Sequence, residues 1–163
     1  MVPVYSTQSS SCFDIHACLP QHTQVNSLVP FPSNPFGSSE LSRVFSVDDT
    51  CSIELPAGTR ALIPTGLKFD IPAQYSVRLH PRSGLSYKHG ITLSGCEGII
   101  DEDYVDEVFV SIFNSSPCSV IIKHGDRICQ GELVLDIRAT IVETSMEPKN
   151  KTNRKGGFGS TGV

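Results

Sequence analysis

The chain has 163 residues and a mass of 17.7 kDa, with 39% apolar and 18% charged residues. This length and composition fit one compact domain and differ from those of a disordered chain. The sequence has no run of 18 apolar residues, and its first ten residues lack the basic and apolar regions of a signal peptide. We therefore expect neither membrane spanning nor Sec-type secretion.

The net charge of −4 is unevenly distributed. Residues 148–163 carry four cations and no acid, which leaves a net charge of −8 on the rest of the chain. Six acids lie between residues 97 and 107. A mostly acidic body argues against binding a long nucleic acid by charge. An acidic cluster with a basic, glycine-rich tail instead favours a small polyanion accompanied by a divalent cation.

The six cysteines show no C-x-x-C spacing. That pattern excludes a zinc ribbon and argues against a disulfide scaffold. Several cysteines stand beside Val, Ile or Phe. We therefore expect reduced thiols that fill the core of an intracellular protein, in the cytoplasm or the nucleus.

Alternation of apolar and polar residues predicts β-strands along most of the chain. In chain order the expected strands are 13–18, 60–63, 67–71, 75–80, 91–93, 107–113, 119–122 and 132–141. Turn residues such as those at 56–58, 89–90 and 124–126 separate them, and the only helix expected is one turn after Arg82. Many short strands must each bury one face, so the expected fold is all-β, a closed barrel or a jelly-roll sandwich.

Two segments lack the strand pattern. Residues 21–50 are rich in Ser, Pro and Asn and are expected to form a long loop excursion. Residues from about 148 to 163 have no strand periodicity and are expected to form a mobile tail. The expected organisation is therefore one domain over residues 1–147, followed by a tail over 148–163.

Five short segments carry residues that a purely structural strand would not need. They are SCFDIHA (11–17), HPRSGLSYKHG (80–90), GIIDEDY (98–104), GDRICQ (125–130) and RKGGFGSTG (154–162). In the second, a guanidinium, a hydroxyl and a glycine N–H follow one another at Arg82, Ser83 and Gly84, which suits a phosphate. In the fifth, glycines around one Phe would let the backbone fold over phosphates while the ring stacks on a base.

Each segment alone also has a plain structural explanation. Asp14 could be a turn or capping residue, the acids of 101–103 a solvated turn, and the glycine-rich tail a linker. Gln130 follows an apolar pair as if it pointed into a pocket. Only their combination in this order points to one function.

That combination closely resembles the five motifs of the trimeric dUTP pyrophosphatase (dUTPase) family, through PRSGL, KHGI, GIIDEDY, GDRI and GGFGSTG. The resemblance implies a jelly-roll-like, distorted β-barrel that assembles as a homotrimer with three active sites at subunit interfaces. It implies that the tail of one subunit closes over a site built by the other two. The implied reaction is hydrolysis of dUTP to dUMP and pyrophosphate, with Mg²⁺ bound through the triphosphate. Such an enzyme limits uracil incorporation into DNA and supplies dUMP for thymidylate synthesis.

The resemblance also implies residue roles. Asp101 would activate the water that attacks the α-phosphorus, and Tyr104 would pack under the deoxyribose and exclude a 2′-hydroxyl. Asp14 would support the water shell of the metal. The other residues that the resemblance assigns to the substrate are Arg82, Ser83, Gly84 and Gln130 on the phosphates, Gly95 and Ile100 near the uracil, Phe158 stacked on the uracil, and Arg154, Gly159, Ser160 and Thr161 toward the terminal phosphates.

The chain departs from the family pattern in three places. Val105 and Asp106 stand where the family usually has Arg-Gly, so the role of that Arg is absent or supplied elsewhere. Arg154 lies only four residues before Phe158, one fewer than usual, which makes Lys155 a substitute candidate. Cys12 stands where a glycine is common.

Deamination of dCTP and binding of a protein partner are the two alternatives to hydrolysis. A dCTP deaminase shares the fold and nucleotide site, but it needs a different acid–base residue and does not normally close with a GGFG tail. A binding or signalling module would instead use the 21–50 excursion to contact a protein partner. Because every catalytic position holds its expected residue type, we expect hydrolysis as the primary function and a protein partner as an addition to it.

Overall fold

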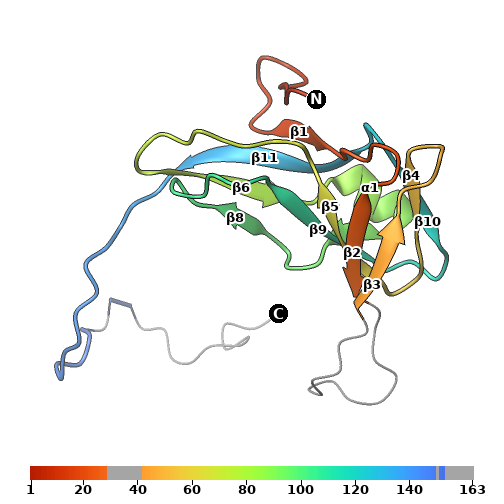
Figure 1. The fold of residues 1–163 in the computed structure, drawn as a ribbon. Coiled ribbons are helices and arrows are strands. Elements are labelled where there is room, and N and C mark those ends of the chain that lie inside the picture. Colours follow the sequence, from red (N-terminus) through yellow and green to blue (C-terminus); the bar gives the residue numbers. More distant parts are fainter. Residues whose placement is uncertain (29–41, 150, 153–163) are drawn as a thin grey trace.

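The computed structural model describes residues 1–28, 42–149 and 151–152 (Figure 1). Within these residues the chain forms eleven strands and one short helix, which confirms the expected all-β class. The strands are β1 (Phe13–His16), β2 (Gln24–Leu28), β3 (Ser42–Ser46), β4 (Ser52–Leu55), β5 (Arg60–Pro64), β6 (Tyr75–His80), β7 (Ile91–Leu93), β8 (Gly98–Ile100), β9 (Phe109–Asn114), β10 (Val120–Lys123) and β11 (Arg127–Leu135), and the helix is α1 (Ser83–His89).

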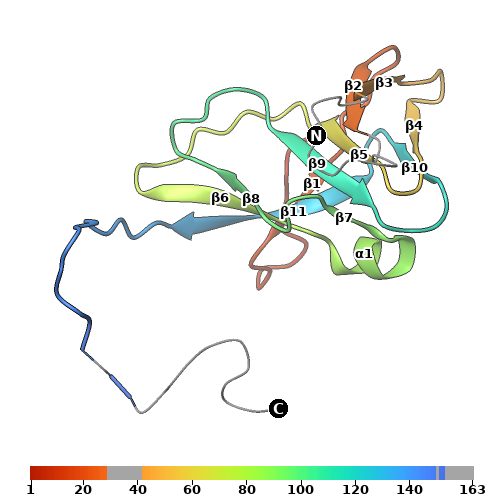
Figure 2. The same cartoon turned by 90° about the horizontal axis from the view of Figure 1, so that it is seen from below.

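The strands form two main antiparallel sheets and one small one. The first sheet has the order β1-β11-β6-β8, and the second has the order β3-β2-β5-β9-β7. A two-stranded sheet, β10-β4, lies beside them, as Figures 1 and 2 show. The first strand pairs with the last, from Phe13 opposite Gly131 to His16 opposite Arg127, so the two ends of the domain are joined in one sheet.

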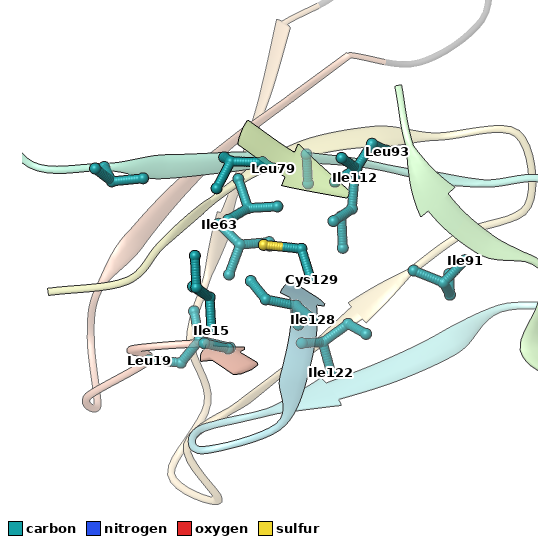
Figure 3. Close-up of a cluster of buried hydrophobic side chains, with 14 of the residues drawn as sticks. Ile15, Leu19, Ile63, Leu79, Ile91, Leu93, Ile112, Ile122, Ile128 and Cys129 are labelled. Atoms are coloured by element: carbon teal, nitrogen blue, oxygen red, sulfur yellow. The ribbon is translucent and has the colours of Figure 1, made fainter. Parts of the chain in front are cut away.

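The core lies between the inner faces of the two main sheets. Figure 3 shows Ile15, Ile63, Leu79 and Ile112 converging there, with the sulfur of Cys129 among them. Burial of these apolar side chains is the main favourable contribution to the stability of the fold. Strand alternation produces this arrangement, because every second residue of each strand faces inward.

The cysteines agree with the sequence prediction only in part. All six are free, as expected. Cys129 is the one that is fully buried in the core, and burial raises the pKa of its thiol to about 12. Cys96 and Cys118 are exposed, so the expectation that the thiols fill the core is wrong for them. Both stand in hairpin and turn segments, and neither has a Val, Ile or Phe directly beside it.

Strands 75–80 and 91–93 are confirmed at the predicted residues. The predicted strand 132–141 is misplaced, because β11 begins at Arg127 and ends at Leu135, and Ile137 and Ile141 are 92% and 96% exposed. Leu135 pairs with Tyr75, the first residue of β6, and in the described part of the chain no neighbouring strand continues beyond this pair. The predicted strand 67–71 is extended backbone that bonds through the Leu67 carbonyl to the N–H of Val108 without forming a ladder.

The prediction of a loop over residues 21–50 is wrong at both ends of that segment. β2 and β3 pair from Gln24 opposite Ser46 to Leu28 opposite Ser42, and β2 also pairs with β5. The sequence of β2, QVNSL, does not predict a strand clearly, because the buried Val25 stands between the polar residues Gln24 and Asn26. Residues 29–41 lie outside the described part of the chain.

The helix after Arg82 is confirmed and is longer than the single turn expected, with seven residues. It ends at Gly90, whose φ of 66° is left-handed and whose N–H donates to the Ser86 carbonyl at 3.0 Å. A Cβ at Gly90 would also lie 2.9 Å from the Ser116 backbone nitrogen. A glycine is therefore required to end α1 and to start β7 directly behind it.

A substitution at Gly131 would test the packing between β1 and β11. A Cβ at this position would lie 2.6 Å from Cζ of the Phe13 ring, well inside contact distance. We expect Gly131→Ala to lower the free energy of unfolding by about 1–3 kcal/mol in urea denaturation. The control is Gly84→Ala in α1, where a new Cβ meets nothing within 4 Å and where Ala is the better helix former. Equal stability of the two variants would contradict this account.

Candidate active site

A buried carboxylate organises the residues at one end of the first sheet. The Asp14 side chain is only 6% exposed and lies between two arginines, with Nε of Arg82 at 3.2 Å from one oxygen and Nη1 of Arg127 at 3.1 Å from the other. Nε2 of Gln130 lies 3.5 Å from the first oxygen, and the Ser6 hydroxyl donates to the second at 3.4 Å. β1, β11 and the residue preceding α1 are thereby joined through one side chain.

The cluster is electrostatically favourable for an ionised Asp14. Burial alone would raise the pKa of this carboxyl, but the hydrogen bond from Arg127 and the charges of Arg82 and Arg127 outweigh burial and hold the pKa below its ordinary value. Two guanidiniums share one carboxylate, so the group as a whole is cationic. A cationic cluster of this kind suits a phosphate-bearing ligand.

The first turn of α1 lies next to this cluster. Ser83 and Gly84 are exposed, and no side chain or backbone outside the helix approaches the position of a Cβ at Gly84. Arg82, Ser83, Gly84 and Gln130, which the resemblance assigns to the phosphates, thus lie near Asp14, which it assigns to the water shell of the metal. The motif GDRICQ does not by itself predict a role for Arg127, because the alternation of a regular strand would place residues 127 and 130 on opposite faces.

A second group lies after β8. Asp101 is exposed and begins a turn in which its carbonyl accepts the N–H of Tyr104 at 3.1 Å. The Tyr104 hydroxyl donates to the Glu107 carbonyl at 2.8 Å, which fixes its ring over this turn. Glu102 is occupied elsewhere, accepting the N–H of Gln74 and pairing with Arg138 at 2.8 Å. Among the described residues no side chain pairs with the Asp101 carboxylate.

The hairpin between β7 and β8 connects the two main sheets. β7 pairs with β9 in the second sheet, whereas β8 pairs with β6 in the first. Gly95 lies at its tip, where the nearest atom to a Cβ would be the Glu97 carbonyl at 3.7 Å. The side chain of Ile100 packs against the core, so its backbone is what remains for a ligand. The hairpin therefore offers mainly main-chain groups.

The two groups lie at opposite ends of β6. Ile100 pairs with Val77 near the start of β6, and Asp101 follows it, whereas Arg82 comes after the last residue of β6. At about 3.3 Å per residue, the length of β6 separates them by roughly 20 Å. In Figure 2, α1 lies at the lower right and the chain leaving β8 runs to the left. Within one chain, Asp101 therefore lies far from Arg82 and the first turn of α1.

The remaining predicted residues lie outside the described part of the chain: Arg154, Lys155, Phe158, Gly159, Ser160 and Thr161. Within the described residues, no three His, Cys, Asp or Glu side chains are grouped as they would be around a metal ion. No helix of that part is both long and apolar enough to cross a membrane.

The two-sheet β fold, with a cationic cluster beside an open helical turn and an acidic turn at the other end, defines an all-β phosphate-binding protein. A family model described as dUTPase matches residues 38–162. The deoxyuridine 5'-triphosphate nucleotidohydrolase of Finegoldia magna is 42% identical over 82% of this chain and 92% of its own length. That of Desulfotalea psychrophila is 37% identical over 99% and 87%. The chain belongs to the dUTPase family.

Solved structures agree with the fold. The dUTPase of Staphylococcus bacteriophage 80alpha with dUPNHPP has a TM-score of 0.73 and 18% identity, covering 100% of this chain and 92% of its own. The dUTPase from Streptococcus mutans has a TM-score of 0.63 and 20% identity, covering 85% and 88%. The fold of this chain is therefore the dUTPase β-barrel expected from the sequence.

His16 makes the stability of this site pH-dependent. Burial lowers the pKa of His16 from 6.5, and Arg127 and Arg82 lower it further, against the opposing charge of Asp14. Its Nδ1 is buried without a hydrogen-bond partner. The unfolded chain binds a proton near pH 6.5 that the folded chain resists, so stability is full above this pH and decreases as the pH falls below it.

We expect the thermal midpoint to decrease between pH 7 and pH 5, and His16→Gln to flatten that decrease. The lowered pKa of Asp14 acts in a separate, more acidic range, because its contribution is lost only as the pH falls below the ordinary Asp value of 3.8. The control is His89→Gln, at an exposed position of α1. A His16→Gln variant with the wild-type slope would show that another group is responsible.

Proposed function

We propose that this protein hydrolyses dUTP to dUMP and pyrophosphate in active sites that combine neighbouring subunits of a homotrimer. Membership of the dUTPase family supports the substrate and the reaction, because the match spans Arg82 to Gln130 and the tail. The observation that carries the shared site is the separation of Asp101 from Arg82 along β6. A second subunit would supply the Asp101 that completes a site around Arg82.

In this site Asp101 acts as the general base. Its carboxylate is exposed, and a water held within hydrogen-bond distance would give it a proton while attacking the α-phosphorus. Pyrophosphate then leaves as the bond to the α-phosphorus breaks. Arg82, the Ser83 hydroxyl and the Gly84 N–H neutralise and align the phosphates, which is most of what phosphoryl substitution requires of a protein.

The residues fit a divalent metal, Mg²⁺, that arrives with the substrate. Both oxygens of Asp14 already accept donors from arginines, so this carboxylate suits hydrogen bonds to metal-bound water better than direct ligation. Gln130 lies beside it and would contact the same waters. When bound, the metal would neutralise phosphate charge and orient the triphosphate.

The uracil and the deoxyribose would be selected by the β7–β8 hairpin and by the turn that follows β8. Gly95 and the Ile100 backbone line the hairpin where uracil would lie, and the fixed ring of Tyr104 would support the deoxyribose. The tail would close the site, with Phe158 on the uracil, Gly159, Ser160 and Thr161 on the terminal phosphates, and Arg154 or Lys155 beside them. Closure excludes water and aligns the substrate.

Exposed apolar residues after β11 support an oligomer. Ile137 and Ile141 are exposed and lie beyond the end of β11, and they belong to no strand among the described residues. Such a run is stabilised when it packs against another copy. The free thiols fit an intracellular location, in the cytoplasm or nucleus. A protein partner bound by segment 21–50 stays a hypothesis.

The activity is tested by pyrophosphate release from dUTP, dTTP, dCTP and UTP, with and without Mg²⁺. We expect release from dUTP alone and dependence on the metal. Ammonia release from dCTP would instead indicate a deaminase. Absence of both products would leave a binding module as the better account.

Mixing two inactive variants tests the shared site. Asp101→Asn should fold normally and lower kcat by about 10²–10⁴-fold, because an amide cannot accept the proton of water. Arg82→Gln should be impaired by loss of phosphate binding. If Asp101 and Arg82 of different subunits form one site, random trimers from an equal mixture should recover about a quarter of the wild-type activity. No recovery, with mixed trimers confirmed by mass spectrometry, would mean that each site comes from one chain.

Tyr104 tests sugar selection. Tyr104→Ala should lower the ratio of kcat/KM for dUTP over UTP, because removal of the ring opens the space that a 2′-hydroxyl needs. Tyr104→Phe keeps the ring and loses only the bond to the Glu107 carbonyl, so it should retain most of the discrimination. An unchanged ratio in Tyr104→Ala would remove this residue from sugar selection.

A further inference from the structure

We propose that Arg127 is a second guanidinium that binds the terminal phosphates of the substrate, beside Arg82. This inference rests on the proposed function, because it adds a ligand to the same triphosphate. Three features of the structure support it: a β-bulge that changes the direction of Arg127, an uncompensated positive charge, and a cavity that both arginines line.

The bulge places Arg127 on the same side as Gln130. Asp14 pairs with Gln130 and Ile15 with Cys129, but His16 pairs with Arg127, so Ile128 is an extra residue in β11. Ile128 and Cys129 are consequently both buried, although neighbours in a regular strand face opposite sides. Arg127 and Gln130, three residues apart, then both reach Asp14. Bulges beside active sites commonly redirect a side chain in this way.

The charge around Asp14 is not balanced. One buried carboxylate faces two guanidiniums, so one positive charge has no counterpart in this cluster. Asp126 also lines the cavity beside the two arginines, and among the described residues its carboxylate accepts the N–H of Lys123 at 2.8 Å and forms no ion pair with either arginine. An anionic ligand would complete the balance, and a polyphosphate is the anion that the proposed reaction provides.

Arg127 is better placed than Arg82 to carry that remaining charge. Arg82 is 23% exposed and uses Nε for Asp14 and Nη1 for the Arg127 carbonyl at 3.1 Å. Arg127 is 53% exposed and holds Asp14 through Nη1, which leaves most of its guanidinium free to bind. Arg82 is thus largely fixed by the protein, whereas Arg127 presents donors to a ligand.

A cavity of about 320 Å³ provides room for the anion. It lies between α1 and the β10–β11 turn, and its lining includes Arg82, Arg127 and His89 over the apolar side chains of Leu85 and Ile122. A water molecule occupies about 30 Å³ in the liquid, so this space can hold several phosphate oxygens. The apolar side chains cover one part of the wall, and a guanidinium–phosphate contact is stronger where such groups exclude competing water. The terminal phosphates carry most of the negative charge of the substrate, so we assign Arg127 to them.

The test compares ligands with and without terminal phosphates. Binding of α,β-imido-dUTP, pyrophosphate and dUMP is measured by calorimetry for wild type and Arg127→Gln. We expect the analogue and pyrophosphate to bind about 10–100-fold more weakly to the variant, the range of a lost charge-assisted hydrogen bond, and dUMP to change by less than about twofold. Arg127→Lys keeps the positive charge but cannot donate two parallel hydrogen bonds as a guanidinium does, so it should lose less affinity than Arg127→Gln.

Two controls separate this role from a structural one. Arg78→Gln also removes an ion-paired arginine of the first sheet, the partner of Asp136 at 2.8 Å, and should leave all three affinities unchanged. In an Asp14→Asn background, Arg127→Gln should still weaken pyrophosphate binding, because the proposed contact is with the ligand itself.

Equal weakening of dUMP and the analogue would overturn the proposal, as would an effect that disappears in the Asp14→Asn background. Either result would mean that Arg127 acts only by holding Asp14. Failure of the proposed function is distinguishable, since wild type would then release no pyrophosphate from dUTP. If Arg127→Gln does not fold, the test uses Arg127→Lys instead. The proposal would then be overturned if this variant bound the dUTP analogue, pyrophosphate and dUMP with wild-type affinities.

Discussion

The buried carboxylate of Asp14 is the interaction on which the phosphate side of this protein depends. It lies almost fully out of water, and an ionised carboxylate in such a position is stable only when it is paired and hydrogen-bonded. Arg82 and Arg127 satisfy it from two different elements, and Gln130 and Ser6 add further donors. The same contacts that stabilise the charge hold a guanidinium next to the first turn of α1. In the proposed site, structural stability and ligand binding would therefore depend on the same side chain.

The antiparallel sheet around β11 sets where that side chain lies. β11 pairs with β1 on one side and β6 on the other, so residues from the beginning, middle and end of the domain meet in one row, with Asp14, Gln130 and His80 in adjacent strands. The register of β6 with β8 then places Asp101 at the far end of β6. One consequence is that the groups proposed for phosphate binding and for catalysis lie apart within a chain. Assembly of several copies is the simplest way for such a chain to complete a site.

Residue types and motif order were sufficient to predict the all-β class, most strand positions and the grouping of Asp14, Arg82 and Gln130. They were sufficient because strands with one buried face alternate strictly, and because residues that bind phosphate are chemically distinctive. The errors have physical causes. Ile137 and Ile141 keep the alternation of a strand although they belong to no strand in the described part of the chain. The pattern of β2 is weak because few of its residues are apolar.

What the amino-acid sequence determined by itself is which chemistry the chain carries and where along it each group stands. It determined the strand periods, the glycine that ends α1 and the acidic and basic segments, because these depend only on neighbouring residues. The tertiary structure alone decided which groups face one another. The bulge at Ile128 turned Arg127 toward Asp14, and the β6–β8 register carried Asp101 away from Arg82. Both depend on pairing between strands distant in sequence, which no local pattern specifies.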